Sequence, residues 1–238
     1  MNVGDLRKMM PALGRFVRKF DSCIKTRPGR KHFRTYVLGQ LGPLERKSVE
    51  PIALEAGVAP RTLQEFLSIH SWDEAAVGRR LRALIRRKHG EESAIGVIDE
   101  TSFAKQGTKT AGVQRQHCGS TGKTDNCVVT VHLGYVTPDF HALLDGELYL
   151  PQSWTEDPDR RLEAGIPAEV VFKPKWRIAL ELLERSLAEK VPLRWVTADE
   201  EYGRVGEFRD RVAGWGLCYV VEIPSNPSAG SARNPKPC

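Results

Sequence analysis

The fold is decided by two apolar stretches that each end in an aspartate, Ile95-Gly96-Val97-Ile98-Asp99 and Leu193-Arg194-Trp195-Val196-Thr197-Ala198-Asp199. Short runs rich in valine and isoleucine are typical of buried β-strands. A carboxylate at the end of a buried strand is costly unless a partner compensates its charge. Magnesium is the expected partner, because it prefers carboxylate and phosphate oxygens. Taken singly, each aspartate could instead begin a turn or cap a helix.

The segments around these stretches predict an α/β fold with a mixed sheet. Strands are expected first, then a helix, a strand, a helix and a last strand, which is the order of the RNase H-like fold. The expected strands are 94–99, 112–118, 126–135 with an extension at 141–150, 193–199 and 217–223, and the helices are 175–190 and 206–214. A polar, charge-rich excursion at 151–167 interrupts them. In that fold the first and fourth strands lie side by side and parallel, so their terminal acids meet.

Asp99 and Asp199 are therefore the candidate catalytic and metal-binding residues. A pair of carboxylates at this place suits two Mg²⁺ or Mn²⁺ ions that promote in-line attack on phosphorus. Glu100 and Glu200 follow one residue later, and strand alternation would point them away from the metals. We expect them to be supporting or turn residues.

The charge of the chain is concentrated in its first part. Residues 1–94 hold 19 Lys and Arg against 10 Asp and Glu, a difference of +9, whereas the whole chain has a net charge of +6. Excess positive charge favours nucleic acid as a partner, because neutralisation of phosphates drives such binding. A merely solvated basic surface is the alternative.

Helices are expected throughout this basic part. Apolar residues recur at helical spacing from Leu6 to Phe20, a basic loop is expected at 26–31, and helices are expected at 32–41 and 72–89. Residues 45–56, the turn at Gly57 and residues 60–69 predict a helix-turn-helix. Arg61, Thr62 and Gln64 would lie on the outer face of its second helix and contact DNA. An ordinary helical hairpin remains the alternative.

Further basic residues are candidates for DNA contacts. Arginines and lysines crowd the expected surface of the helix at 72–89, with Arg82 counted among them. Arg86, Arg87 and Lys88 at its end are expected to contact DNA, as are Arg115 and Lys123 beside the loop between the second and third strands. That loop, Gly119–Thr124, resembles a phosphate-binding P-loop but has His117 where the motif needs glycine.

Composition excludes several classes. No apolar run approaches the length of a membrane span, and the first 20 residues lack the core of a signal peptide. The five cysteines are scattered without a C-x-x-C pair, which favours buried thiols over a disulfide framework or a zinc site. We therefore expect a cytoplasmic protein that has no contact with a membrane.

Six segments together carry a family resemblance: His32-Phe33-Arg34-Thr35-Tyr36-Val37-Leu38-Gly39, Arg46-Lys47-Ser48-Val49-Glu50-Pro51-Ile52-Ala53, Arg61-Thr62-Leu63-Gln64-Glu65-Phe66-Leu67, Val97-Ile98-Asp99-Glu100-Thr101-Ser102-Phe103, Gly112-Val113-Gln114-Arg115-Gln116 and Asp199-Glu200-Glu201-Tyr202-Gly203. Over about residues 5–225 the chain resembles the bacterial insertion-sequence transposases of the DDE superfamily endonuclease type. The resemblance implies metal-dependent cleavage and strand transfer on double-stranded transposon-end DNA, by a bacterial protein associated with the nucleoid. It also implies that Asp99 is the first catalytic acid and Asp199 the second.

The chain departs from the family at its end. The family carries a third acid, a glutamate, on a helix well after the last strand. Residues 224–238 are rich in Pro, Ser, Gly and Asn and contain no Asp or Glu, which predicts a disordered tail. We therefore expect a truncated, incomplete RNase H-like core that binds metal weakly and is inactive alone.

Three regions and several functions follow from this interpretation. Residues 1–93 are the expected helical DNA-binding domain, 94–223 the partial catalytic core and 224–238 the tail. The first functional hypothesis is a transposase. The alternative is a non-catalytic DNA-binding remnant that inhibits an intact transposase or pairs with it or with a second copy. A metal-dependent nuclease without strand transfer also stays open.

Overall fold

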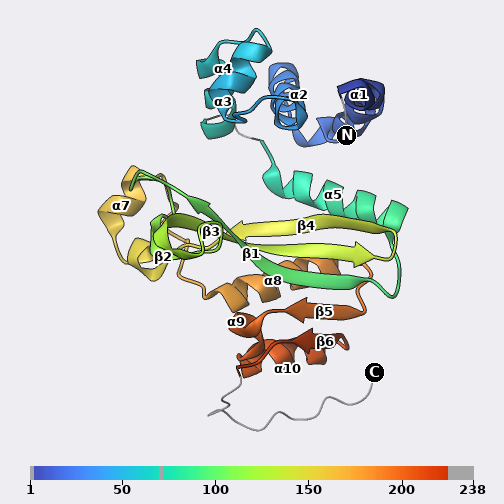
Figure 1. The fold of residues 1–238 in the computed structure, drawn as a ribbon, viewed down its shortest axis with the longest axis vertical. Coiled ribbons are helices and arrows are strands. Elements are labelled where there is room, and N and C mark those ends of the chain that lie inside the picture. Colours follow the sequence, from blue (N-terminus) through green and yellow to red (C-terminus); the bar gives the residue numbers. More distant parts are fainter. Residues whose placement is uncertain (1–2, 70–71, 225–238) are drawn as a thin grey trace. The chain divides into compact units, whose positions relative to one another are not determined.

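The structure, a computed structural model, describes residues 3–69 and 72–224. The chain divides into two compact units, Met1–Leu81 and Arg82–Cys238, and the division falls inside one helix, α5 (Glu74–His89) (Figure 1). The predicted tail, apart from Pro224, lies outside the described residues. Among the helices of the described part, none has the length and apolar character needed to cross a membrane.

The first unit is helical, as predicted. Its helices are α1 (Val3–Arg18), α2 (Arg27–Leu41), α3 (Val49–Glu55) and α4 (Pro60–Ser68), with a 3₁₀ turn at Asp21–Cys23. The predicted loop at 26–31 is wrong, because α2 already begins at Arg27. Thr26 caps this helix by accepting a hydrogen bond from the Gly29 amide at 3.1 Å. Pro28 is compatible with a first helical turn, where its missing N–H is not needed.

The predicted pair of helices around Gly57 is confirmed. Gly57 has a φ of +63°, a conformation that glycine adopts without strain. The helix before Gly57, α3, is shorter than expected and begins at Val49. Ile52, Ala53, Leu63 and Phe66 are buried between the helices. The apolar spacing in the sequence was therefore a sound guide to which faces pack.

The second unit is built on a six-stranded mixed sheet with the order β2-β3-β1-β5-β6. β4 pairs with the later part of β3, on the same edge as β2 and opposite β1. β1 is antiparallel to β3 and parallel to β5, and β5 is parallel to β6. The predicted adjacency of the two aspartate-bearing strands is thus confirmed. The strands are β1 (Ile95–Ala104), β2 (Gln114–Cys118), β3 (Lys123–Thr137), β4 (Phe140–Leu148), β5 (Trp195–Ala198) and β6 (Cys218–Val221).

One strand boundary differs from the prediction in a way that matters for the site. Asp99 does not end β1, because the strand continues to Ala104. Beyond Asp99 the strand stays paired with β3, from Glu100 opposite Val131 to Ala104 opposite Cys127. The parallel partner β5 is paired only as far as Val97. At Asp99, β1 is therefore paired with β3 but no longer with β5.

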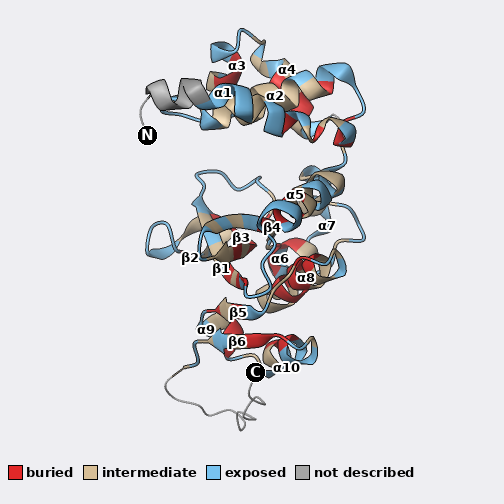
Figure 2. Cartoon of the chain, turned by 90° about the vertical axis from the view of Figure 1, so that its right-hand side faces the viewer, coloured by how far each residue is buried: buried red, intermediate tan, exposed pale blue. Residues whose placement is uncertain are grey.

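Helices cover one face of this sheet. α8 (Lys175–Ala188) packs on β3 and β4, and α10 (Gly206–Gly214) packs on α8 and β6 (Figure 2). Leu180, Leu182 and Leu183 of α8 are buried. The short helix α9 (Glu200–Gly203) connects β5 to α10. The predicted amphipathic helix and the helix after β5 are both confirmed.

The polar segment 151–167 is partly helical, which its composition did not predict. It holds two short helices, α6 (Gln152–Thr155) and α7 (Pro158–Glu163). Trp154 is fully buried and its Nε1 donates to the Val113 carbonyl at 2.8 Å. The Arg160 guanidinium lies 3.7 Å from the centre of the Trp154 ring. A single aromatic residue thus fixes a segment that is otherwise charged.

Arg82 is buried, so its predicted place on the surface is wrong. Only 4% of the residue is exposed. Its guanidinium donates to Asp145 at 2.9 Å and to the two carboxylate oxygens of Glu189 at 2.6 and 2.9 Å. Arg185 also donates to Asp145, at 3.0 Å. This network joins the end of α5 to β4 and to the end of α8.

We predict that Arg82→Met lowers the free energy of unfolding of the second unit by about 3 kcal/mol, because it leaves the partly buried carboxylates of Asp145 and Glu189 without their main cation. Arg211→Met is the matched control. Arg211 forms an exposed pair with Glu184, and such pairs contribute about 0–1 kcal/mol. Chemical denaturation followed through tryptophan fluorescence measures both variants, since four of the five tryptophans belong to the second unit. Equal losses of unfolding free energy for Arg82→Met and Arg211→Met would show that the buried network is no more stabilising than the exposed ion pair.

Candidate metal and nucleic-acid site

The register between β1 and β5 brings the two aspartates to the same level of the sheet. Ile95, Gly96 and Val97 pair with Trp195, Val196 and Thr197. Asp99 and Asp199 each lie two residues beyond the last pair. Both line one hollow of about 380 Å³ at this end of the strands. The structure therefore brings together the two acids that the sequence singled out.

The two carboxylates are exposed, which corrects the expectation of buried acids. Asp99 Oδ1 accepts a hydrogen bond from the Glu100 amide at 2.7 Å. Asp199 Oδ1 accepts one from the Glu201 amide at 3.0 Å and so caps α9. Among the described residues, no hydrogen bond or ion pair reaches the Oδ2 atom of either aspartate. Each side chain is thus oriented by one oxygen while the other can meet a ligand.

Glu222 is a third acid that lines the same hollow. Ala198 pairs with Val221, so Glu222 follows β6 next to Asp199, and its amide donates to the Ala198 carbonyl at 3.2 Å. Like the two aspartates, Glu222 directly follows an apolar strand. In the part of the chain that the structure describes, no three His, Cys, Asp or Glu side chains lie close enough together to hold a metal ion.

Glu222 is held in place by a close backbone approach. A Cβ atom on Gly203 would lie 1.9 Å from the Glu222 carbonyl oxygen, well inside contact distance. Only glycine fits there without displacing β6. The end of α9 and the end of β6 can therefore meet beside the hollow.

A second cluster of charges lies on the helix-covered face, directly behind the two aspartates. Lys175 Nζ donates to Glu100 at 2.7 Å and to Glu201 at 3.0 Å. The Tyr202 hydroxyl donates to the other oxygen of Glu100 at 3.1 Å. As predicted from strand alternation, Glu100 points away from Asp99. Glu200 is exposed in the first turn of α9.

This cluster connects the segments that carry the two aspartates. Glu100 follows Asp99 in the chain, and the amide of Glu201 holds Asp199. Burial raises the pKa of the Glu100 carboxyl, while its bonds to Lys175 act in the opposite direction. Burial also raises the pKa of Tyr202, so its hydroxyl keeps its proton and remains a donor. Lys175 is therefore a cationic bridge between β1 and α9.

His132 lies opposite Asp99 on the neighbouring strand. Its Nε2 is 2.7 Å from the Thr130 hydroxyl. Burial lowers the pKa of His132, and the charge of Asp99 opposes that shift. A Cβ atom on Gly146 would come within 2.6 Å of Nδ1, so the ring is packed against the backbone of β4.

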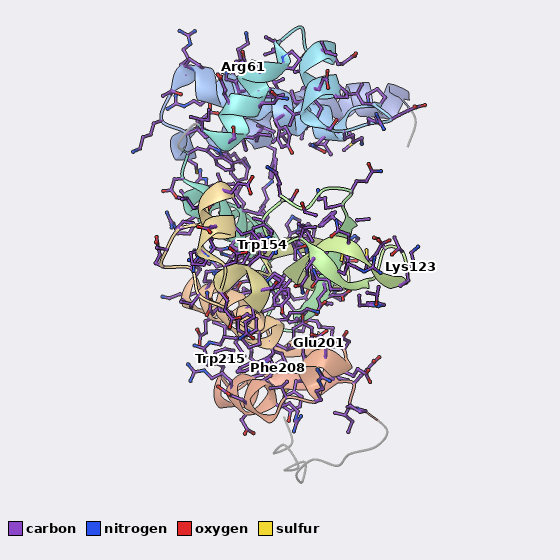
Figure 3. All side chains as sticks on the ribbon, turned by 90° about the vertical axis from the view of Figure 1, so that its left-hand side faces the viewer. Arg61, Lys123, Trp154, Glu201, Phe208 and Trp215 are labelled. Carbon is purple, nitrogen blue, oxygen red and sulfur yellow. The ribbon has the colours of Figure 1, made fainter. Side chains whose placement is uncertain are left out.

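The predicted DNA-contacting residues are at the surface. On α4, Arg61 and Gln64 are exposed and Thr62 is half-buried, while Arg61 pairs with Glu65 at 2.8 Å. Arg115 and Lys123 are exposed on the hairpin formed by β2 and β3, with Lys123 at its tip (Figure 3). Arg86, Arg87 and Lys88 are exposed in the last turn of α5, where Arg86 donates to the Glu189 carbonyl at 2.6 Å. Of the site residues predicted from the sequence, Asp99 and Asp199 are the two that line one hollow.

Comparison with known proteins gives a consistent assignment. The sequence model described as "DDE superfamily endonuclease" matches residues 19–237. A "Probable transposase for insertion sequence element IS701" from Microchaete diplosiphon is 32% identical over 197 residues. The match covers 82% of this chain and 49% of that protein, so the chain spans about half the length of the curated relative it matches.

Solved structures give only distant similarity. The Drosophila P element transposase strand transfer complex matches 91% of this chain and 43% of its own, with 11% identity and a TM-score of 0.35. A pre-cleavage Mos1 transpososome matches 79% of this chain and 58% of its own, with 12% identity and a TM-score of 0.25. At these values the comparisons carry no argument about this chain.

We predict that Lys175→Met lowers the free energy of unfolding of the second unit by about 2 kcal/mol at neutral pH, because the largely buried Glu100 and the half-buried Glu201 lose their cation. Lys173→Met is the control. Lys173 is a neighbouring, more exposed lysine that pairs with Glu181 and Glu147. Chemical denaturation measures both. A loss for Lys175→Met no larger than for Lys173→Met would contradict the bridging role.

Proposed function

The chain belongs to the DDE superfamily endonuclease family, and we propose that it binds double-stranded DNA and presents Asp99 and Asp199 to a divalent cation for phosphodiester chemistry. The observation that carries the proposal is the parallel register of β1 and β5, which puts both acids at one level and in one hollow. The order of β4, β3, β1, β5 and β6, with its antiparallel and parallel pairs, also supports an RNase H-like core.

The donor atoms fit magnesium or manganese. Both acids offer hard carboxylate oxygens, and magnesium is commonly held by one or two carboxylates together with water and phosphate oxygens. When bound, such an ion supplies Lewis-acid activation at phosphorus and at the attacking oxygen. A site for two ions needs a further acidic ligand, and Glu222 is the acid that lines the same hollow.

The protein's own residues orient the two carboxylates and leave them accessible. Asp99 is held in a strand that stays paired with β3, and Asp199 is held by the first turn of α9. Lys175 connects the backbone segments next to both acids. Because both side chains are exposed, a duplex can reach them without entering a closed cavity. These features suit a macromolecular substrate.

DNA binding is assigned to the basic helices and to the β2–β3 hairpin. We assign Arg61, Thr62 and Gln64 of α4 to base contacts, on the interpretation of α3 and α4 as a helix-turn-helix. Arg86, Arg87 and Lys88 of α5 and Arg115 and Lys123 of the hairpin would contact phosphates. The excess of +9 charges in residues 1–94 supports this assignment.

A second function is favoured by one observation. Within the described residues, no three metal-ligating side chains converge. Two carboxylates alone hold magnesium weakly, since this ion needs near-ideal octahedral coordination. The second candidate is therefore a DNA-binding protein that does not cleave and that acts by occupying DNA ends or by pairing with an intact transposase or with a second copy.

We predict that Asp99→Asn and Asp199→Asn each weaken Mn²⁺ binding at least about tenfold, since removing even an outer partner of a metal ligand costs 10–100-fold. Any metal-dependent cleavage of duplex DNA should fall at least about a hundredfold. Electron paramagnetic resonance titration and a nicking assay measure the two effects. Asp139→Asn, in the exposed turn between β3 and β4, is the control.

These measurements separate the two functions. Equal Mn²⁺ affinity in wild type and both variants would remove the metal site. Intact DNA binding with no cleavage by the wild-type chain would favour the non-cleaving alternative.

We also predict that Gln64→Ala changes the preference among duplex sequences more than Lys88→Ala does. A residue that reads base edges affects specificity, whereas a phosphate contact weakens binding to every sequence alike. Competitive binding to a pool of randomised duplexes provides the measurement. Equal losses across all sequences for Gln64→Ala would count against α4 as a recognition helix.

A further inference from the structure

A strongly basic pocket in the first unit has no role in the site described above. It lies at the start of α2 and has a volume of about 640 Å³. Its lining includes four cationic residues, Arg27, Arg30, Lys31 and Arg34, and a single carboxylate, Asp21. Counting four positive charges against one negative charge gives an excess of three. We call this feature the α2 basic pocket.

The placement of these cations opposes helix stability. Positions 27, 30, 31 and 34 are spaced by three, four and seven residues, so they share one face of α2. Like charges at such spacing repel each other and destabilise a helix. Positive charge in the first turn is also unfavourable next to the positive end of the helix dipole. An anion in the pocket would relieve both effects.

Two of the four cations are fixed and two are free to reach a ligand. Arg30 Nε donates to the Ile24 carbonyl at 2.8 Å, and Arg34 forms an ion pair with Asp21. Arg27 and Lys31 are exposed and have no hydrogen-bond or ion-pair partner among the described residues. Since Thr26 already accepts the Gly29 amide, side chains rather than backbone amides provide the binding groups.

The pocket is also tied to α4 by packing within the same unit. α2 packs against both α3 and α4. The ring of His32, which lines the pocket, lies 6.0 Å from the ring of Phe66 on α4. A ligand in the pocket would therefore have a fixed position relative to the exposed face of α4.

We propose that the α2 basic pocket binds a backbone phosphate of double-stranded DNA and so positions α4 on the duplex. Arginine and lysine are the side chains that bind phosphate oxygens most readily. Phosphate contacts from neighbouring elements set the register of a recognition helix without reading sequence themselves. This inference rests on the proposed DNA binding for its ligand, and it adds a contact that the exposed faces of α4 and α5 do not provide.

The first test compares two charge-matched double variants of the full chain. Arg27→Gln with Lys31→Gln removes the free cations of the pocket, and Arg46→Gln with Lys47→Gln removes two exposed cations that do not line it. We expect the pocket variant to reduce the slope of log affinity against log salt by about 2, on specific and random duplexes alike. The control should keep the wild-type slope.

The second test separates a ligand site from a structural role and uses inorganic phosphate as the probe, without DNA. At low salt the pocket variant should have a Tm equal to or above that of the wild type, because repulsion is removed. Added phosphate should raise the Tm of the wild type more than that of the pocket variant. A lower Tm for the pocket variant at low salt would show that the cations are structural and would overturn the inference.

The remaining outcomes also decide the matter. If the wild type binds duplex DNA and the pocket variant has the same slope, this inference fails while the proposed DNA binding stands. If phosphate raises the Tm of the wild type alone but both proteins have the same slope of log affinity against log salt, the pocket binds free anions. The assignment of a DNA phosphate to the pocket is then overturned. If the wild type binds no duplex, the proposed function itself fails.

Discussion

The parallel pairing of β1 with β5 is the constraint on which the rest of this structure depends. Three residue pairs, ending at Val97 and Thr197, set the level of Asp99 against Asp199. A shift of one residue would turn one aspartate to the helix-covered face and leave the other where it is. The hollow and the charge cluster behind the sheet both depend on this register.

Local patterns in the sequence predicted the elements that are held together by near neighbours. The apolar spacing of Leu63 and Phe66 identified the buried face of α4, and Gly57 identified the turn before it. The runs ending at Asp99 and Asp199 identified the two strands, because valine-rich runs signal burial wherever they occur. These features depend on a few adjacent residues, which is why they could be found without a structure.

What the sequence did not reveal depends on partners far away in the chain. Arg82 is one of several arginines in its segment, and its burial depends on Glu189, which lies 107 residues later in the chain. Trp154 sits in a polar segment and becomes a core residue because Val113 and Val128 pack in one cluster with it. Glu222 gained its place from the pairing of β5 with β6. No pattern within a window of ten or twenty residues contains this information.

The same β1–β5 pairing has a consequence for the order in which the protein folds. β1, β3 and β4 follow one another closely, whereas Val97 and Thr197 are separated by 100 residues (197 − 97). Contacts between distant residues form late, because closing a long loop costs more entropy. During synthesis, β1 must wait with one edge unpaired until β5 has been made. Such an edge invites pairing with another chain. The strand that carries Asp99 is therefore the part of this sheet most exposed to misassembly before folding is complete.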